Sequence, residues 1–302
     1  MKTLILLHST TGNTRLITRY VASCITKAGH KCQIHDIVSK PKPPPLGTVD
    51  LLGVACPTMY FRPTFAIERF VARLPNPAKP KPVFLLATAG GEPGAHFSLL
   101  AEQLANKGYI TLGAHWVIFP ASWPPQRALV KKIAKGAPYG SMLAARYPAL
   151  LPLLATFWPE IGVPGVEDRD RLGQFIEGIL SKVPTFRPDE APSFMDLHKP
   201  MPGSNLSGRM FTSEMAGEYT AVRILPERCT RCGICLKVCP AGCITREYEE
   251  ALPIVGKGCT GCWACFQHCP DRAVAGWKVE PGEGLYSGPP REIKELFKPI
   301  PS

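Results

Sequence analysis

CTRCGICLKVCP at residues 229–240 and CTGCWACFQHCP at residues 259–270 carry the same pattern of cysteines. Each stretch has cysteines at its first, fourth, seventh and eleventh positions and a proline after the last one, and the second stretch begins 30 residues after the first. Without an evident secretion signal, such clustered cysteines indicate metal binding in a reducing compartment, the cytoplasm, and not disulfides. Zinc ribbons use pairs of C-x-x-C, not triplets that end in Cys-Pro, so zinc is the weaker interpretation.

This spacing resembles the cysteine run of bacterial ferredoxins, in which three thiolates on a tight turn each reach one iron of a [4Fe–4S] cluster. A helix carries the fourth cysteine away, and in the two-cluster fold it completes the other cluster. The resemblance implies two sets of ligands, Cys229, Cys232, Cys235 and Cys269 for one cluster and Cys259, Cys262, Cys265 and Cys239 for the other. Two adjacent clusters serve to pass single electrons.

We expect the four other cysteines to be packing residues. Cys24 and Cys32 lie on the inner faces of a predicted helix and a predicted strand, and Cys56 ends a buried strand. Cys243 follows Cys239 by four residues, and the second stretch has alanine at the matching position, so a small buried side chain fits there.

The first 135 residues alternate strand-like and helix-like segments. Apolar runs predict strands at 2–8, 31–37, 51–55, 83–87 and 111–119, and helical spacing predicts helices at 13–28, 65–74, 96–107 and 126–135. Strands that alternate with helices imply parallel pairing with right-handed crossovers. The sequence therefore predicts a doubly wound α/β domain, whose ligands bind at the carboxyl ends of the strands.

A polar segment joins the first predicted strand to the first predicted helix. Hydroxyl and backbone N–H groups at a helix N-terminus form a cradle for phosphate. The segment lacks the lysine of a P-loop and contains no G-x-G-x-x-G run, so neither a nucleoside triphosphate nor a dinucleotide is expected, and FMN is favoured over FAD. Its residues are Ser9, Thr10, Thr11, Gly12, Asn13 and Thr14.

Two further segments follow the third and fourth strands, where the isoalloxazine ring of a flavin would lie. An aromatic ring at Tyr60 or Phe61 can stack on the flavin, and glycines at 90 and 91 let backbone N–H groups approach its polar edge. The alternative is that both segments only connect strands to helices. The candidate flavin contacts are Pro57, Thr58, Met59, Tyr60 and Phe61 in one segment and Thr88, Ala89, Gly90 and Gly91 in the other.

These motifs together resemble a known family. Residues 1–135 are similar to flavodoxin through the phosphate loop and the two flavin segments, and residues 219–281 resemble a bacterial two-cluster ferredoxin. The whole chain resembles the flavodoxin–ferredoxin fusions of anaerobic bacteria and archaea, and the turn at 120–123 also looks like that family. The resemblance implies a flavodoxin-like, five-stranded parallel sheet and a small α+β ferredoxin domain.

The chain departs from this family at two points. Flavodoxins carry an aromatic residue early in the segment after the fourth strand, whereas 88–94 has none. Residues 136–218 match no known module and are predicted to be a proline-rich connector with one amphipathic helix at 168–182, while 282–302 are predicted to form a tail.

The chain has a formal charge of +11, in contrast to the acidic flavodoxins and ferredoxins. Each oxidised cluster with its thiolates carries about −2 and an FMN phosphate about −2, so the loaded protein would lie near +5. We therefore expect no nucleic acid partner, and a redox partner protein with an acidic docking face. The apolar stretch 147–158 is interrupted by prolines and too short to span a membrane, although it could lie on one.

The leading hypothesis is an electron carrier or relay that links a two-electron donor to one-electron acceptors. A second hypothesis is a reductase, in which the flavin reduces a small substrate with electrons from the clusters. It requires a proton donor over the flavin, for which His8, His96, His115 and Tyr60 are candidates by position. A third hypothesis is a subunit of a larger redox complex, docked through the apolar segment 140–165 and the basic surface.

Overall fold

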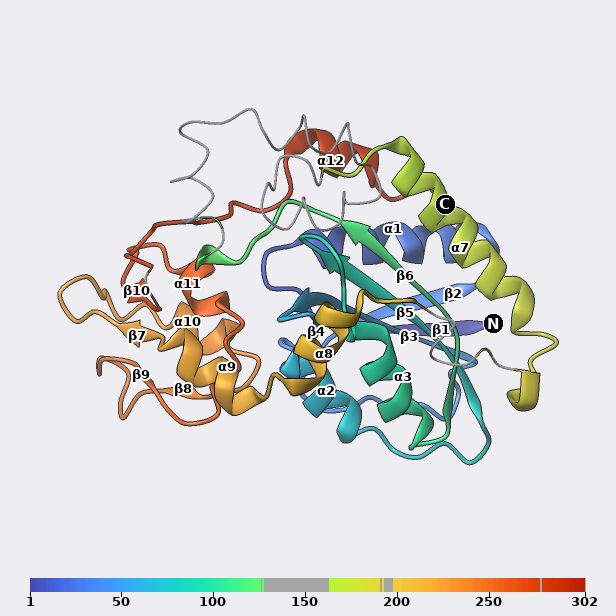
Figure 1. Cartoon of the computed structure of the whole chain (residues 1–302), viewed down its shortest axis with the longest axis horizontal. Helices are drawn as coiled ribbons and strands as arrows, with labels where there is room; N and C mark the ends of the chain where they lie inside the picture. Colours follow the sequence, from blue (N-terminus) through green and yellow to red (C-terminus); the bar gives the residue numbers. More distant parts are fainter. Residues whose placement is uncertain (126, 128–162, 191, 193–197, 278, 302) are drawn as a thin grey trace.

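The computed structural model of the protein describes residues 1–125, 127, 163–190, 192, 198–277 and 279–301. Five parallel strands form the main sheet in the order β2-β1-β3-β5-β6, with the short β4 beside β3 (Figure 1). Numbered along the chain, the parallel strands have the order 2-1-3-4-5 of flavodoxin-like folds, which confirms the predicted fold class. The strands are β1 (Lys2–Leu7), β2 (Lys31–Asp36), β3 (Leu51–Met59), β4 (Arg62–Pro63), β5 (Lys81–Ala89) and β6 (Tyr109–Ile118).

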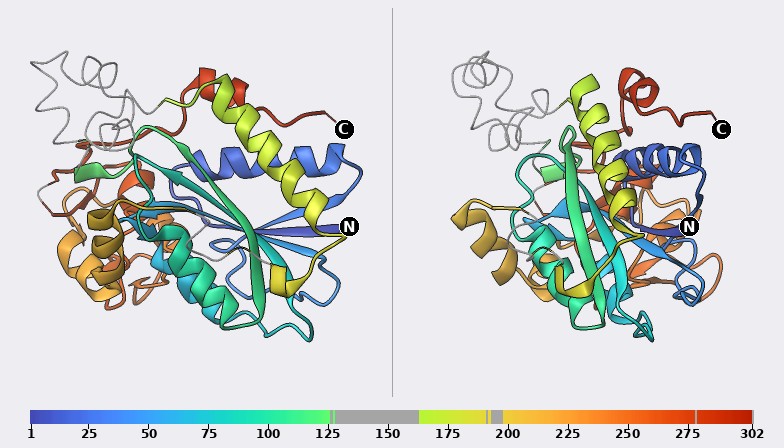
Figure 2. Two further views of the ribbon diagram at one scale, coloured as in Figure 1. Left: turned by 45° about the vertical axis from the view of Figure 1, so that its right-hand side comes forward. Right: turned by 90° about the vertical axis from the view of Figure 1, so that its right-hand side faces the viewer.

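Helices cover both faces of this sheet (Figure 2). Helices α2 (Phe65–Ala72) and α3 (His96–Ala105) lie on one face, and α1 (Asn13–Lys27) and α7 (Val166–Lys182) lie on the other. Because both faces are covered, the central strands read as continuous apolar runs.

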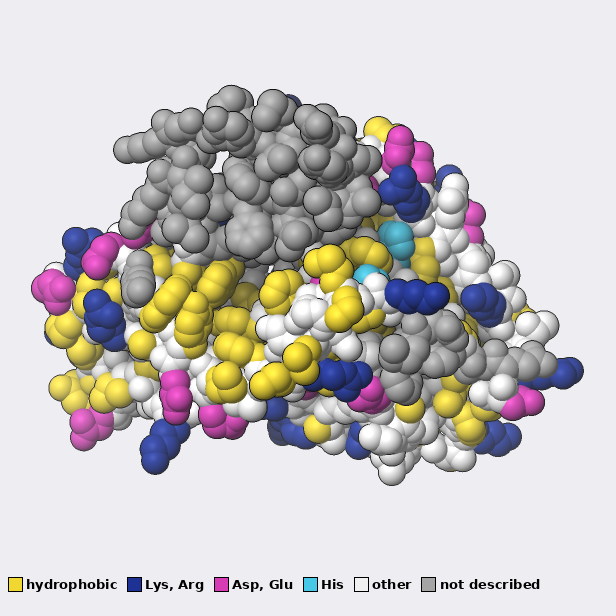
Figure 3. All heavy atoms as spheres, in the orientation of Figure 1, with side chains coloured by type: hydrophobic (Ala, Val, Ile, Leu, Met, Phe, Trp, Pro, Cys, Tyr) yellow, Lys and Arg dark blue, Asp and Glu magenta, His cyan; other side chains and the backbone are white. Residues whose placement is uncertain are grey.

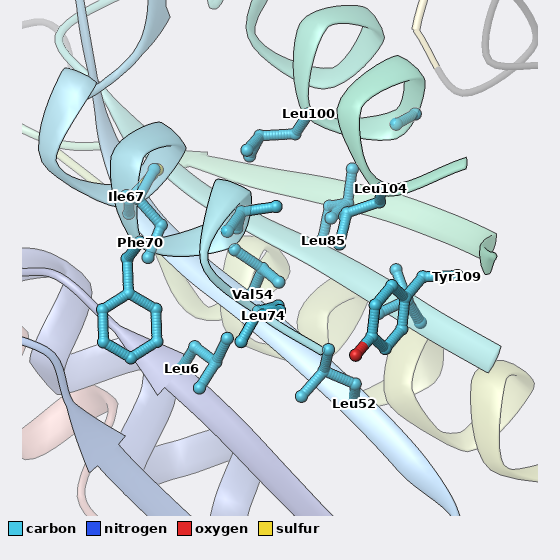
Figure 4. Packing of buried hydrophobic residues seen from close by; sticks show 14 of the residues in the cluster. Leu6, Leu52, Val54, Ile67, Phe70, Leu74, Leu85, Leu100, Leu104 and Tyr109 are labelled. Atoms are coloured by element: carbon cyan, nitrogen blue, oxygen red, sulfur yellow. The ribbon is translucent and has the colours of Figure 1, made fainter. Parts of the chain in front are cut away.

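The core on the α2 and α3 face is packed from alternate residues of the central strands (Figure 4). Leu6, Val54 and Leu85 meet Phe70 and Leu104 from the two helices, and all five side chains are buried. Burying each such side chain contributes about 1.5–3 kcal/mol. The carboxyl ends of the strands are therefore held in fixed positions.

Two segments outside the first 135 residues complete the opposite face. Helix α7, which the sequence places in the connector, buries Leu172, Ile176 and Ile179 against the sheet and α1. Helix α12 (Arg291–Leu296), which the sequence places in the tail, lies in the same core together with Phe297, which is fully buried. The predicted helix at 126–135 and the predicted docking segment 140–165 lie largely outside the described residues.

The segment after the third strand differs from the predicted loop. Strand β3 continues to Met59 because Thr58 and Met59 pair with Pro63 and Arg62 in an antiparallel hairpin. The tip of this hairpin consists of Tyr60 and Phe61, both with left-handed backbone angles.

A smaller module lies beside the carboxyl end of the sheet (Figure 1). Its strands pair as β7 with β10 and β8 with β9, and its helices α10 and α11 pack together. Left-handed angles recur 30 residues apart, at Arg231 and Gly261 and at Gly233 and Trp263, so the sequence repeat is also a repeat of backbone structure. The elements are β7 (Arg223–Ile224), α10 (Ile234–Val238), β8 (Ile244–Thr245), β9 (Ile254–Val255), α11 (Ala264–His268) and β10 (Val274–Ala275).

Helices α8 (Pro202–Met210) and α9 (Ser213–Thr220) connect the two parts, after the short 3-10 helix η4 (Pro188–Glu190). Gly208 packs against Phe61, and a methyl group at 208 would lie 2.2 Å from the Phe61 carbonyl oxygen. Leu206 and Met210 face outward, on a side of the molecule where Figure 3 shows hydrophobic side chains gathered. These helices thus use small residues to approach the sheet closely.

Candidate cofactor sites

A cavity of about 640 Å³ lies at the carboxyl edge of the sheet. All three predicted flavin segments line it, and of their residues only Gly12 does not. The structure thus brings together residues that the sequence spreads over 80 positions, while their role in flavin binding stays a prediction.

The phosphate end of the cavity is formed by the start of α1. Gly12 precedes the helix with a left-handed φ of 99°, and the Ser9 Oγ accepts hydrogen bonds from the N–H groups of Gly12 and Arg15 at 3.2 and 3.3 Å. In the described residues, the N–H groups of Thr10, Thr11, Asn13 and Thr14 have no acceptor. Four free N–H groups beside a helix N-terminus suit the phosphate of FMN.

Segments from the far end of the chain cover this phosphate loop. The Tyr286 hydroxyl donates to Asn13 Oδ1 at 2.8 Å, and Pro289 lies against Gly12. His268 Nε2 donates to the Thr10 carbonyl oxygen at 2.7 Å, so this imidazole nitrogen carries its hydrogen. Gly12 therefore faces the C-terminal segment instead of the cavity.

The ring end of the cavity has aromatic walls. Tyr60 stacks on Phe211 with ring centroids 4.3 Å apart and meets Trp123 edge-on at 6.0 Å. Trp277 and Tyr219 also line the cavity and lie 4.3 Å apart. These rings supply the apolar surface that the 88–94 segment lacks, and they suit a flat heteroaromatic ring.

Glycines bring the second flavin segment close to the loop after β6. A methyl group on residue 90 would lie 2.9 Å from the Ala121 Cβ, so only glycine permits this approach. The buried hydroxyls of Thr14 and Thr88 share a hydrogen bond of 2.7 Å, which ties the phosphate loop to the end of β5. The backbone of this segment is thereby fixed along one wall of the cavity.

An ion pair lies at the rim of the cavity. Glu92 Oε1 is 2.9 Å from His198 Nε2, and the backbone N–H of Gly94 donates to Glu92 Oε2. Burial raises the pKa of Glu92, but hydrogen bonds from His198, Ser204 and Gly94 outweigh burial and leave this pKa below its usual value. Glu92 is therefore ionised at neutral pH, and neither residue is among the sequence candidates.

The three histidines considered as proton donors do not line the cavity. His8 bonds to Thr64 and His96 to Thr58, and burial lowers their pKa values to about 4 and about 3. His115 stacks on Phe175, away from the cavity, and burial lowers its pKa to about 4. Tyr60 alone among the four candidates reaches the cavity.

The predicted cluster ligands surround two separate small cavities. Cys229, Cys232, Cys235 and Cys269 line one of them, and Cys239, Cys259, Cys262 and Cys265 line the other. Each cavity thus receives three cysteines from one run and the fourth from the other, as the resemblance implies. In the described residues, no group of three or more Cys, His, Asp or Glu is close enough to hold a single metal ion.

Cys243 is buried, but its thiol lies among the ligands of the second set. Its Sγ is 3.5 Å from the Cys239 Sγ and it lines the same cavity. Hydrogen bonding from Cys243 lowers the pKa values of Cys239 and Cys259 to about 6. Cys56 shows the ordinary behaviour of a core thiol, because burial raises its pKa to about 12.

Residues 221–270 match the family model of the 4Fe-4S dicluster domain. No curated protein sequence matches the chain. Within the described residues, no helix has the length and apolar character needed to cross a membrane.

Several solved flavoproteins are similar in structure to the N-terminal part. A flavodoxin from the domain Archaea is 16% identical, covers 61% of this chain and 99% of its own, and has a TM-score of 0.39. Flavodoxin 1 from Bacillus cereus is 14% identical, with 60% and 98% covered and a TM-score of 0.40. Rubredoxin oxygen:oxidoreductase from Desulfovibrio gigas is 13% identical over 61% of this chain and 36% of its own, with a TM-score of 0.39.

The strand order and the family match confirm the predicted combination of a flavodoxin-like sheet domain with a 4Fe-4S dicluster domain. The match implies [4Fe–4S] chemistry in the smaller module.

Proposed function

We propose that the chain is an electron-transfer flavo-iron–sulfur protein. It binds FMN in the large cavity and two [4Fe–4S] clusters on the eight cysteines, and it passes electrons onward to redox partner proteins. The observation that carries this proposal is the composition of the cavity wall, because Trp277 of the smaller module and Tyr219 of α9 lie opposite the flavin segments of the sheet domain.

The cavity offers each part of FMN a suitable surface. The free N–H groups at the start of α1 hold the phosphate, and the backbone at 88–91 borders the polar edge of the ring. The aromatic rings of Tyr60, Phe211 and Trp123 exclude water from the ring system. Bound FMN takes up two electrons and releases them singly, and each cluster moves one electron at a time.

Direct hydrogen bonds fix the smaller module to the cavity. Gln267 Nε2 donates to the Ser122 carbonyl oxygen at 2.7 Å, and its Oε1 accepts from the Tyr286 N–H at 2.9 Å. His268, from the same helix, reaches the phosphate loop. Electrons can therefore pass between flavin and clusters inside one chain without a docking step.

We also propose that external partners present an acidic face and that the protein works in the cytoplasm. The formal charge of +11 stays positive after two clusters and a phosphate are added. Such a charge attracts acidic surfaces and speeds their association. Lower ionic strength should therefore accelerate electron exchange with an acidic ferredoxin.

The reductase hypothesis has less support from the cavity. A substrate reduced at the flavin needs a proton donor within reach, and no histidine lines the cavity. The hydroxyl of Tyr60 already donates to the Gly261 carbonyl oxygen at 3.0 Å. The cavity therefore favours electron transfer over substrate conversion.

Flavin titrations of the cofactor-free sheet site test the first half of the proposal. FMN should bind more tightly than riboflavin, which lacks the phosphate, and more tightly than FAD, whose adenosine has no matching surface. Equal binding of all three flavins would contradict the assigned phosphate cradle.

Ligand variants test the second half. Cys232→Ser and Cys262→Ser should each remove up to about four irons per chain, since they disturb different clusters. The matched control is Cys24→Ser, which lies on α1 and should leave iron content unchanged. Loss of all iron from both ligand variants with a folded sheet domain would point to one shared centre instead of two.

A further inference from the structure

The hairpin tip at residues 60 and 61 is held in an unfavourable backbone conformation. Tyr60 and Phe61 have φ angles of 56° and 58°, where L-residues lose about 1–2 kcal/mol each. Neighbouring contacts hold the tip in place, since the Phe61 carbonyl accepts from the Ala95 N–H at 2.8 Å and Gly208 packs against it. Such strain persists where the surrounding structure fixes a functional geometry.

The strained conformation points Tyr60 in two useful directions at once. Its ring lines the flavin cavity between Phe211 and Trp123. Its hydroxyl donates to the carbonyl oxygen of Gly261, which lies between the ligands Cys259 and Cys262. Burial raises the pKa of Tyr60, so the hydroxyl stays protonated and remains a donor. One side chain thus joins the flavin cavity to a cluster-binding loop.

Other contacts bring the same loop close to the sheet domain. Arg69 Nη1 donates to the Gly258 carbonyl oxygen at 3.3 Å. Gly217 of α9 approaches so closely that a methyl group there would lie 2.7 Å from the Cys259 carbonyl oxygen. The 259–265 loop is therefore clamped between the hairpin, α2 and α9.

The matching loop at 229–235 lacks such contacts. In the described residues, no hydrogen bond joins 229–240 to the sheet domain, and Cys232 is exposed to solvent. His268, which precedes the ligand Cys269, does reach the sheet domain, but it meets Thr10 at the phosphate end and not at the ring end. The two cluster sites are thus unequal toward the cavity.

We propose that the cluster on Cys239, Cys259, Cys262 and Cys265, the inner cluster, exchanges electrons directly with the flavin across Tyr60. The cluster on Cys229, Cys232, Cys235 and Cys269, the outer cluster, receives electrons only from the inner one and delivers them at the protein surface. This order rests on the proposed function, since it requires both the flavin and the two clusters.

The test is rapid-freeze EPR after photoreduction of the flavin in the full-length loaded protein. Cys262→Asp and Cys232→Asp replace one thiolate by a carboxylate and mark the inner and the outer cluster by altered spectra. In the unsubstituted protein, the signal that Cys262→Asp alters should appear first. Appearance of the signal marked by Cys232→Asp first, or of both together from the earliest time, would overturn the proposed order.

Tyr60 variants test the bridge itself. Tyr60→Leu should slow the first electron transfer by about tenfold or more while iron and flavin contents per chain stay the same, and Tyr60→Phe should slow it less. Tyr248→Leu, an exposed tyrosine on the β8–β9 hairpin, is the matched control and should leave this rate unchanged. An unchanged rate in Tyr60→Leu would refute the bridge, whereas a protein that never holds flavin would refute the proposed function.

Discussion

Gly261 is the residue of the cluster loop on which the contact with Tyr60 depends most. Its φ is +62°, and a methyl group at this position would lie 2.7 Å from the Tyr60 hydroxyl oxygen and 2.8 Å from the Ala216 carbonyl oxygen. We predict that Gly261→Ala loosens the junction between the hairpin, α9 and the cluster loop. The left-handed angle costs about 1–2 kcal/mol, and a displaced, unpaired hydroxyl costs about 1–3 kcal/mol more.

The total cost for Gly261→Ala is therefore about 2–5 kcal/mol. At roughly 2–4 °C per kcal/mol for a protein of this size class, thermal bleaching of the cluster absorbance should shift down by about 5–15 °C. Bleaching is irreversible, so all variants are compared anaerobically at one scan rate. Arg231→Ala is the control, because Arg231 occupies the matching repeat position with a φ of 60° and already carries a side chain there. It should change the midpoint by no more than about 2 °C.

A double-mutant cycle separates the contact from the backbone effect. Tyr60→Phe removes the hydroxyl that a methyl group at 261 would meet, so Gly261→Ala should cost about 1 kcal/mol less in that background. Strict additivity of the two substitutions would refute the reasoning, since it would show that residues 60 and 261 do not interact.

Three other substitutions probe separate parts of the structure. Cys243→Ala should retain eight irons, within about one, but lower the midpoint potential of the inner cluster in an EPR-monitored titration, because a hydrogen bond to the Cys239 sulfur is lost; an unchanged potential would contradict this role. Burial lowers the pKa of His8 from 6.5 to about 4, so the unfolded chain binds one more proton in that range and stability rises with pH by about 1.4 kcal/mol per unit. His8→Gln should reduce the slope of urea-unfolding stability against pH between 4 and 6.5 by that amount, and an unaltered slope would show that His8 titrates normally. Phe297→Ala should destabilise the sheet domain by about 3–5 kcal/mol in the same unfolding assay, because its buried ring packs against Tyr20 and Phe119, whereas the exposed Lys298→Ala should have little effect.

Local sequence predicted those features that a short stretch of chain determines. The spacing of the cysteines alone assigned four ligands to each of two cavities, and the structure places the same sets around them. The alternation of strands and helices, with the polar turn at Ser9–Thr14, located the cavity at the carboxyl edge of the sheet. Both patterns depend on neighbouring residues and therefore appear in the sequence.

Contacts between distant segments could not be predicted in the same way. Phe211, Tyr219 and Trp277 reach the cavity only because α8 and α9 bring the smaller module against the sheet. The 166–182 helix is visibly amphipathic, but its periodicity does not say which surface its apolar face covers. The left-handed hairpin tip at Tyr60 and Phe61 has no sequence signal, since turns of this kind normally carry Asn or Gly.

The most direct test of the central claim is a cofactor count on protein purified without oxygen. Iron, acid-labile sulfide and flavin are determined per chain, and stepwise reduction is followed by absorbance and EPR. The account predicts about eight irons, about eight sulfides and one FMN, with the flavin and both clusters reducible in the same molecule. Eight irons without flavin would contradict the assignment of the large cavity, and zinc in place of iron would contradict the account as a whole.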